Sequence, residues 1–192
     1  MSNQQILKFS DYKKQIMTKK LYTFIIMIYI SICNVSDVFA SKTVKKKNYN
    51  EIQIFFTPSL ECETNIIEKL NKSNKIDIAV YSITNPRITD AIISAYERGA
   101  IVRVITDRTQ AKGKKSLVET IKEAGIPLLM NIKHRIEHNK FAVFDDVYVV
   151  SGSYNWTTNA SMYNSENCVF FYQPNKEYSY RFEYLWNLYN ND

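Results

Sequence analysis

The sequence contains little glycine and little proline, four residues of each, and it shows no internal repeat and no low-complexity segment. Of its 192 residues, 45% are hydrophobic, 14% aromatic and 23% charged. This composition excludes an intrinsically disordered chain, because it supplies enough apolar side chains to build a core. At about 150 residues per domain, the length predicts one globular domain.

The apolar run near the N-terminus is too short to cross a membrane comfortably. It extends over 13 residues, from Leu21 to Cys33, whereas a spanning helix needs about 20. Lys19 and Lys20 precede the run, and "VFA" follows it and ends at Ala40. This order is typical of a secretory signal peptide rather than of a permanent membrane helix.

We therefore predict that residues 1–40 form a signal peptide that is cleaved after Ala40, which makes the mature protein secreted or periplasmic. The polar stretch before Met17 is unusual for such a signal, and a true translation start at Met17 would explain it. Residues 41–51 are predicted to be a basic leader, and residues 52–192 the folded domain.

Cysteine is also scarce, with three residues in the whole chain. Removal of the signal would leave Cys62 and Cys168, an even pair in an oxidising compartment. A disulfide between them and two free buried thiols are both compatible with the sequence, because sequence alone does not place their Cα atoms within bonding range.

The charge balance is basic, with a formal net charge of +6. Residues 1–40 contain five lysines and two aspartates, so the remainder carries a net charge of +3. A mildly basic chain suits an anionic partner such as nucleic acid or an anionic lipid surface. The charge does not choose between these partners.

Hydrophobic periodicity and turn residues predict an alternation of strands and helices. The predicted strands are 52–57, 75–83, 100–107, 127–131, 140–146, 147–153 and 166–172. The predicted helices lie within 62–73, 84–99, 117–126 and 175–189, and the last presents Tyr180, Tyr184 and Leu188 on one face. The pattern indicates an α/β fold in which a mixed sheet is flanked by helices on both faces.

A group of polar side chains accompanies the predicted hairpin that turns at Asp145 and Asp146. His138, Lys140 and Asp145 form the pattern H-x-K-x-x-x-x-D where the first hairpin strand begins. The segment "GSYNWT" after the second strand adds Ser153 and Asn155. Imidazole, ammonium, hydroxyl and amide groups in this arrangement are suited to binding one phosphate.

This constellation resembles the phospholipase D superfamily, specifically its short bacterial members with a single catalytic motif, which include secreted endonucleases. The resemblance extends over roughly Ile52 to Tyr189 and includes the segments "YSITNP", "ITDR" and "NSEN". It implies the mixed sheet of the phospholipase D and nuclease fold, with one motif per chain.

The resemblance also implies a role for each motif residue. His138 would be the nucleophile that attacks phosphorus and forms a phosphohistidine, while Lys140, Ser153 and Asn155 would bind the phosphate. Glu166 in "NSEN" would accept a hydrogen bond from the other imidazole nitrogen and so fix the tautomer.

Asp145, the third member of the motif, would support the structure of the catalytic site without touching substrate. The reaction needs a second histidine as general acid and base. Short relatives obtain it by forming a homodimer, so each site is expected to hold His138 of both subunits. No cofactor and no metal is implied, because the chain has no C-x-x-C pair and no second histidine at ligand spacing.

Other candidate residues carry a weaker signal. His134 lies in a basic loop before the motif and Trp156 follows Asn155; we interpret Trp156 as a core residue. Lys112, Lys114 and Lys115 follow "ITDR", where they are positioned to contact a phosphate backbone or to form a solvated loop.

The sequence therefore predicts an exported, metal-independent phosphodiesterase, and it favours a nonspecific endonuclease acting on DNA or RNA. A phospholipase D that releases phospholipid head groups is the alternative, because its catalytic residues would be the same. An inactive phosphate-binding protein is a remote third hypothesis, which the intact motif disfavours.

Overall fold

The computed structural model describes residues 17–22, which are helical, and residues 52–191. The rest of the predicted signal peptide and leader lies outside the described residues, so those assignments stay predictions. Within the described residues, no helix has the length and apolar content needed to cross a membrane. The folded domain belongs to the second of two units in the chain, Tyr49–Asp192.

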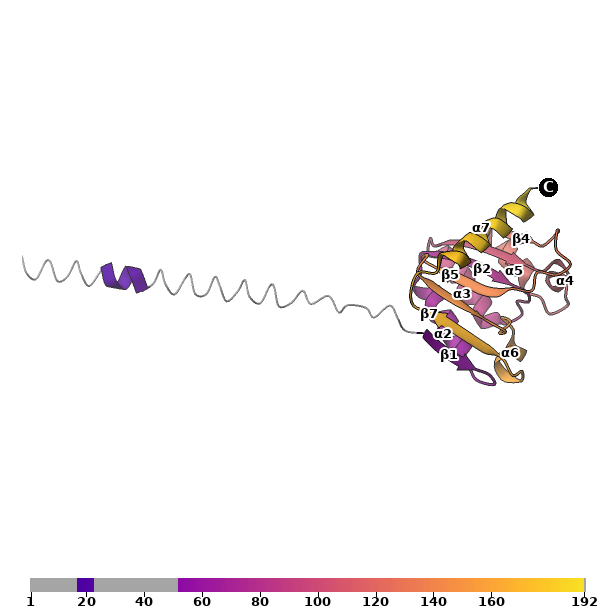
Figure 1. The fold of residues 1–192 in the computed structure, drawn as a ribbon, viewed down its shortest axis with the longest axis horizontal. Coiled ribbons are helices and arrows are strands. Elements are labelled where there is room, and N and C mark those ends of the chain that lie inside the picture. Colours follow the sequence, from indigo (N-terminus) through magenta and orange to yellow (C-terminus); the bar gives the residue numbers. More distant parts are fainter. Residues whose placement is uncertain (1–16, 23–51, 192) are drawn as a thin grey trace, which may run out of the picture. The chain divides into compact units, whose positions relative to one another are not determined.

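Seven strands form one mixed sheet in the order β1-β7-β6-β5-β2-β3-β4 (Figure 1). The strands are β1 (Ile52–Phe56), β2 (Lys75–Val80), β3 (Ile101–Thr106), β4 (Leu128–Met130), β5 (Lys140–Phe144), β6 (Tyr148–Gly152) and β7 (Asn167–Phe171). Strands β2, β3 and β4 run parallel, and every other neighbouring pair is antiparallel. The predicted mixed sheet is confirmed.

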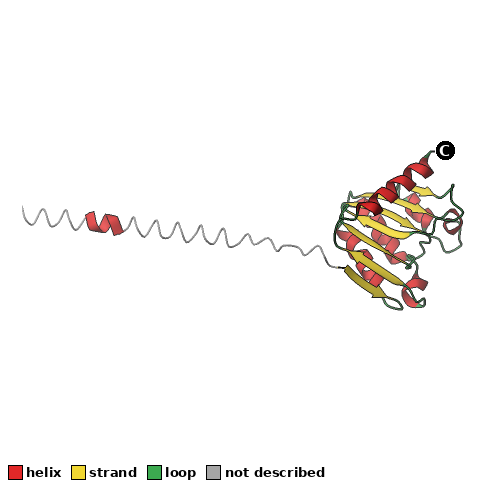
Figure 2. Cartoon of the chain, in the orientation of Figure 1, coloured by secondary structure: helices red, strands yellow, loops and turns green. Residues whose placement is uncertain are grey.

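Helices lie on both faces of the sheet, as predicted (Figure 2). They are α2 (Glu61–Lys72), α3 (Pro86–Glu97), α4 (Arg108–Ala111), α5 (Val118–Glu123), α6 (Thr158–Met162) and α7 (Lys176–Asn190). Ile66 of α2, Ile92 of α3 and Ile121 of α5 share one core with the sheet. Phe182 and Leu185 of α7 belong to a second core on the opposite face.

Strand β2 is buried on both faces, as its nearly continuous apolar sequence predicts. Ile76 and Ile78 point into the larger core, and Ala79 points into the smaller one. Asp77 is also buried, and its carboxylate accepts hydrogen bonds from Arg103 of β3 at 2.7 and 2.9 Å. Arg103 donates in addition to Glu183, which fastens α7 onto the sheet.

The sequence did not decide which face of α7 is buried. Tyr180 and Tyr184 are exposed, whereas Phe182, Leu185 and Tyr189 are buried. The spacing i, i+3, i+7 of these three residues also matches one helical face, so the periodicity was compatible with either choice. The core contacts of the helix decide between them, because Phe182 and Leu185 pack against the sheet.

The predicted hairpin between β5 and β6 is confirmed. Asp145 and Asp146 have φ of 54° and 56°, and Val147 N donates to Phe144 O at 3.0 Å. Two consecutive left-handed residues within one i to i+3 turn match the twist of the flanking strands. Strand β5 begins at Lys140, so His138 lies in the loop two residues before the strand rather than on it.

Candidate active site

The predicted phosphate-binding residues meet where several strands begin or end. His138 lies two residues before β5 and Lys140 begins that strand, Ser153 and Asn155 follow β6, and Glu166 immediately precedes β7. All five residues, together with Gly152, line one hollow in the surface. The structure therefore brings together residues separated by up to 28 positions, while it leaves Asp145 at the opposite end of β5.

The imidazole of His138 is exposed and, among the described residues, makes no hydrogen bond. Its ring meets the half-buried ring of Tyr81 edge-on, with centroids 4.7 Å apart. Tyr81 also fixes the loop, because its N–H donates to Asn139 O at 2.8 Å. Both nitrogens of the His138 ring are therefore available to a ligand, on a backbone that is held in place.

Lys140 contacts the peptide of its neighbour in the motif. Its Nζ donates to His138 O at 2.6 Å and lies 4.9 Å from the centroid of the Tyr81 ring. Burial lowers the pKa of the Lys140 ammonium, and the negative charges of Glu166 and Glu137 act in the opposite direction. The lysine is a partly desolvated cation, in which state it attracts an anion more strongly than in bulk water.

Ser153 is placed by a close approach of β6 and β7. Its Oγ accepts a hydrogen bond from Asn167 N at 3.0 Å, and its own N–H donates to Asn167 O at 3.1 Å. Gly152 before it has φ of +146°, and a side chain there would collide with the backbone carbonyl of Asn167. Glycine therefore allows the close approach that sets Ser153 beside the hollow.

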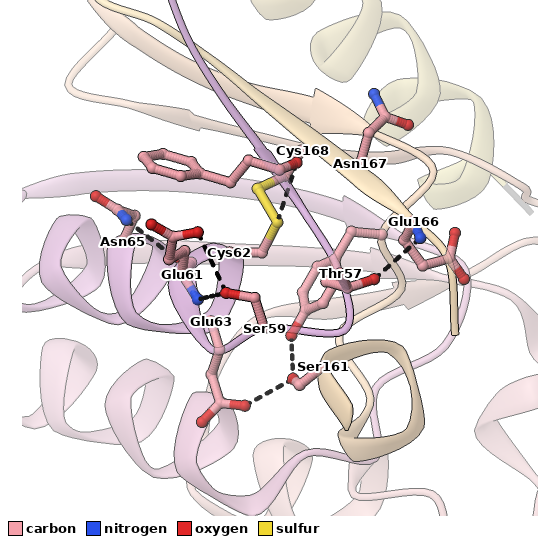
Figure 3. Close-up of a disulfide and its surroundings, with 12 residues drawn as sticks. Thr57, Ser59, Glu61, Cys62, Glu63, Asn65, Ser161, Glu166, Asn167 and Cys168 are labelled. Carbon is pink, nitrogen blue, oxygen red and sulfur yellow. Dashed lines mark hydrogen bonds between the residues drawn. A yellow bond between two sulfur atoms is a disulfide. The ribbon is translucent and has the colours of Figure 1, made fainter. Parts of the chain in front are cut away.

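Glu166 is fixed mainly through its backbone. Its N–H donates to Thr57 Oγ1 at 2.9 Å, and its carbonyl accepts from Thr57 N at 3.0 Å (Figure 3). Its carboxylate accepts a hydrogen bond from Asn164 at 3.0 Å, and among the described residues it makes none with His138. The predicted bond to the imidazole is not formed in this structure, although both side chains line the same hollow.

Asn155 lines both the hollow at His138 and a second, polar hollow. Its side-chain oxygen is buried and has no hydrogen-bond partner among the described residues. Hydroxyl and amide side chains dominate the second hollow, which contains one ammonium group and no carboxylate. It is lined by Tyr81, Ser82, Thr84, Gln110, Lys115, Asn155, Thr157, Thr158, Asn159 and Asn164.

Cys62 and Cys168 form a disulfide that joins α2 to β7 (Figure 3). This resolves the choice that the sequence left open. Cys168 lies two residues after Glu166, and Cys62 Sγ is also 3.8 Å from Phe55 O. The covalent link therefore lies close to the segment that carries the Glu166 carboxylate.

The structure separates the remaining candidates. His134 is bonded through Nδ1 to Tyr189 OH at 2.6 Å, and Trp156 is buried in the core as predicted. Lys115 lines the polar hollow, whereas Lys112 and Lys114 are simply exposed. Among the described residues, no group of three or more His, Cys, Asp or Glu side chains is placed to hold a metal ion.

Sequence reasoning did not single out three residues that shape the site. Tyr81 lies within the quoted segment "YSITNP", so its aromatic ring after a buried strand was the available signal. Thr57 bonds to Glu166, which is distant in the chain, and Glu137 bonds to Asn139 within a loop. No local sequence pattern predicts either bond.

Comparisons with known proteins show the family of the chain. Residues 66–186 match the family model described as "Cardiolipin synthase, PLD-like domain". A mitochondrial cardiolipin hydrolase of Chlamydomonas reinhardtii is 32% identical over 116 residues, 59% of this chain and 52% of the relative. A phospholipase D of Rickettsia felis is 31% identical over 138 residues, 68% of this chain and 69% of the relative. The chain thus spans about half the length of the first relative.

Solved structures show the same architecture. Nuc from Salmonella typhimurium, described as a phospholipase D family member, superposes with a TM-score of 0.67 at 28% identity. The match includes 71% of this chain and 94% of Nuc. NucT from Helicobacter pylori, at 22% identity and a TM-score of 0.66, has the same fold.

Proposed function

The chain belongs to the family of phospholipase D-like domains, and on that premise we propose that it is a metal-independent phosphodiesterase acting through a phosphohistidine. One observation supports this most strongly. An unbonded imidazole, a partly desolvated ammonium, a hydroxyl and an amide line a single hollow. Such a set suits one phosphate, with the His138 ring as nucleophile and Lys140, Ser153 and Asn155 around the non-bridging oxygens.

The proposed reaction has two displacements at phosphorus. In the first, a lone pair on a His138 ring nitrogen forms the P–N bond while the P–O bond to the leaving group breaks. A second imidazole gives its proton to the departing oxygen. In the second displacement, that imidazole takes a proton from water, the water oxygen bonds to phosphorus, and the P–N bond breaks to release a phosphomonoester.

Glu166 would stabilise the positive charge that develops on the His138 ring. Glu166 and His138 line the same hollow, and the Glu166 backbone is fixed by Thr57, so the proposed contact requires the Glu166 carboxylate to leave Asn164. Glu166→Gln is expected to slow phosphoenzyme formation by about ten- to a thousandfold, which single-turnover kinetics would measure. An unchanged rate would remove this role.

We further propose that the second imidazole is His138 of another copy of the chain. The outward face of edge strand β1 presents Ile52, Ile54 and Phe56, which are 51, 53 and 67% exposed. Phe56 lies opposite Asn167, next to Glu166, so this apolar row reaches the side of the active site. A row of exposed apolar side chains on an edge strand is suited to burial against a partner.

The homodimer predicts that assembly and activity are lost together. Ile54→Glu should yield a monomer by light scattering with little residual activity, whereas Gln53→Glu adds the same charge to the same strand on its other face and serves as the control. Mixing wild type with His138→Asn should lower activity by more than dilution, because mixed dimers lack one histidine. A fully active monomer would contradict the two-histidine scheme.

The polar hollow favours nucleic acid over phospholipid as substrate. Its hydroxyl and amide groups can bind sugar hydroxyls and base edges beside the scissile phosphate, but they offer no apolar wall for acyl chains. Lys115 adds one cation that can reach a neighbouring phosphate. We therefore favour a nonspecific endonuclease on DNA or RNA.

One observation favours the alternative, a phospholipase D. The lining of a third hollow includes Leu60, Pro86, Met162 and Tyr163 beside the polar residues Glu63, Asn85, Arg87 and Thr158, so part of its wall offers apolar surface to a lipid. Thr158 borders both this hollow and the polar one, and the polar one shares Asn155 with the hollow at His138. The Rickettsia relative is named phospholipase D and the Chlamydomonas relative a cardiolipin hydrolase.

A substrate comparison separates the two functions. The purified protein is assayed in excess chelator on plasmid DNA, RNA, vesicles of phosphatidylcholine or cardiolipin, and bis(4-nitrophenyl) phosphate. For a nuclease, Asn159→Ala should reduce cleavage of oligonucleotides while sparing the small diester, and Met162→Ser should change neither. Preferential lipid hydrolysis that depends on Met162 would establish a phospholipase D. Binding of phosphate without turnover of any substrate would establish an inactive phosphate-binding protein.

Secretion or periplasmic location stays part of the proposal, and the disulfide supports it, because disulfides persist mainly in oxidising compartments. N-terminal sequencing should show that the protein recovered outside the cytoplasm begins at the residue after Ala40. A sequence that began at Met1 or Met17 would contradict cleavage.

A further inference from the structure

Glu137 is a buried carboxylate immediately before the proposed nucleophile. Its exposed fraction is 2%, although residues 132–136 before it and His138 after it are exposed. Burying a carboxylate is costly unless hydrogen bonds satisfy its oxygens. The chain therefore directs one charged side chain inward within a loop that otherwise faces solvent.

Both carboxylate oxygens of Glu137 are satisfied, by residues on two different segments. Oε1 accepts from Asn139 N at 3.2 Å and from Asn139 Nδ2 at 2.5 Å. Oε2 accepts from Tyr189 OH at 2.8 Å, so the same side chain binds the loop and the C-terminal helix α7. The backbone N–H of Glu137 donates at 3.0 Å to the buried carboxylate of Asp107, the residue that follows β3.

The Tyr189 hydroxyl extends this network to His134. The hydroxyl has one proton, which it donates to Glu137, so His134 Nδ1 must carry a proton and donate to the Tyr189 oxygen at 2.6 Å. Burial, followed by the bond to Glu137, raises the pKa of the Tyr189 hydroxyl, which keeps it protonated as a donor. His134 thus helps to hold the loop in place through Tyr189 and Glu137.

These hydrogen bonds fix the residues on either side of His138, and among the described residues none of them involves its imidazole ring. On the N-terminal side, Glu137 is held by Asp107 and Tyr189; on the C-terminal side, Asn139 is held by Glu137 and by Tyr81. The carbonyl of His138 itself accepts from Lys140. A backbone fixed by hydrogen bonds, with a ring that makes none among the described residues, leaves a lone pair of the imidazole free for an in-line attack on phosphorus.

We propose that Glu137 is a positioning residue for the phosphodiesterase reaction: its buried carboxylate fastens the loop that carries His138 to Asn139 and to Tyr189 of the C-terminal helix. This inference rests on the proposed function, because it concerns the placement of the His138 nucleophile. Glu137 does not line the phosphate hollow, so it acts through its neighbours rather than on the substrate.

The charge of Glu137 gives the proposal a second readout. The Lys140 ammonium faces the carboxylates of Glu166 and Glu137, and both raise its pKa against the larger effect of burial. The other titratable groups packed around Glu137 are Asp107, Tyr189 and His134. Activity is expected to fall at alkaline pH as the Lys140 ammonium loses its proton. Removing the Glu137 charge should lower the pKa of Lys140 and so move this alkaline limb of the pH–rate profile to lower pH. A change of packing alone would not move it.

The test compares Glu137→Gln with Tyr189→Phe in the full chain. Glu137→Gln preserves shape and removes charge; it should lower kcat by roughly ten- to a hundredfold while KM changes little, because misplacing the reacting atom affects turnover more than binding. Phosphoenzyme formation should slow by the same factor, and the alkaline limb should shift downward. Tyr189→Phe should give a smaller fall in kcat without the shift.

The control is Tyr172→Phe, which removes a tyrosine hydroxyl bonded to Gln53 at 2.7 Å, just beyond the end of β7 opposite the site, and should leave kcat unchanged. His138→Asn provides the reference: if it remained active, the proposed function would fail. If His138→Asn were inactive but Glu137→Gln retained kcat and the alkaline limb, only this inference would fail. Should Glu137→Gln not fold, Tyr189→Phe decides, and wild-type kcat in that variant overturns the inference.

Discussion

The two ends of strand β5 carry the same sequence motif and differ in how their polar groups are bonded. At the turn end, Asp145 accepts from Asn74 N at 2.8 Å and Lys75 N at 3.0 Å, and Asp146 pairs with the Lys75 ammonium at 2.9 Å. At the other end, the His138 backbone is fixed while its imidazole has no hydrogen bond among the described residues. Groups satisfied within the protein stabilise it, and the group left unsatisfied is available to react.

The largest expected effect separates the two ends by activity. His138→Asn should lower kcat by about a thousandfold or more, near 4 kcal/mol of transition-state stabilisation, and leave the unfolding midpoint almost unchanged. Asp145→Asn should retain most of the activity of the folded protein. Steady-state kinetics and thermal unfolding of both variants make the comparison. Equal loss of activity at the two positions would erase the distinction between the ends.

A second contrast concerns the disulfide beside the reactive end. It closes a loop between residues 106 apart in sequence. Replacing both cysteines by alanine should lower the free energy of unfolding by about 3–5 kcal/mol, because the unfolded chain gains conformational freedom. Denaturant titration would measure it, with reducing agent on wild type as the matched condition. Unchanged stability in both cases would show that the bond contributes nothing.

At the turn end, the expected effect is on stability and is smaller. Asp145→Ala removes the acceptor for two backbone N–H groups and places alanine at a φ of 54°. Unfolding free energy should fall by about 1–3 kcal/mol. Asp145→Gly, which accepts the positive φ but lacks the carboxylate, isolates the hydrogen-bond contribution by chemical denaturation. A glycine variant as stable as wild type would assign no stability to these bonds.

The smallest expected effect is a change in pH dependence at the reactive end. Burial lowers the pKa of Lys140 below its ordinary 10.5. If the charged lysine binds phosphate, its contribution to activity should be full below that lowered pKa and be lost as pH rises through it. The pH–rate profile of wild type should show this alkaline limb, and the residual activity of Lys140→Arg should not, because arginine stays charged. A limb that persists in the arginine variant would belong to another group.

Sequence patterns predicted the fold well where periodicity is unambiguous. The strands, the hairpin at Asp145 and Asp146, and helices α2, α3, α5 and α7 follow from local spacing and turn residues, whereas the short helices α4 and α6 were not predicted. The buried face of α7 could not be predicted, because two sets of apolar side chains share the helical period and only packing on the sheet selects Phe182 and Leu185.

The candidate site was predicted in part for a similar reason. His138, Lys140, Ser153 and Asn155 are close in sequence to the hairpin, so the turn itself brings them together. The roles of Thr57 and Glu137 depend on bonds to Glu166, 109 residues away, and to Tyr189, 52 residues away. Tertiary structure creates these contacts, and the local sequence around either residue does not predict them.

The most direct test of the account is to trap the covalent intermediate. A diester labelled at the scissile phosphorus is mixed with the protein in excess chelator, quenched without acid, digested and mapped. The phosphohistidine mechanism predicts a label on the peptide containing His138 that is stable in base and lost in acid, as expected for a phosphoramidate. Absence of any label there, with activity that chelator abolishes and added metal restores, would contradict the phosphohistidine mechanism.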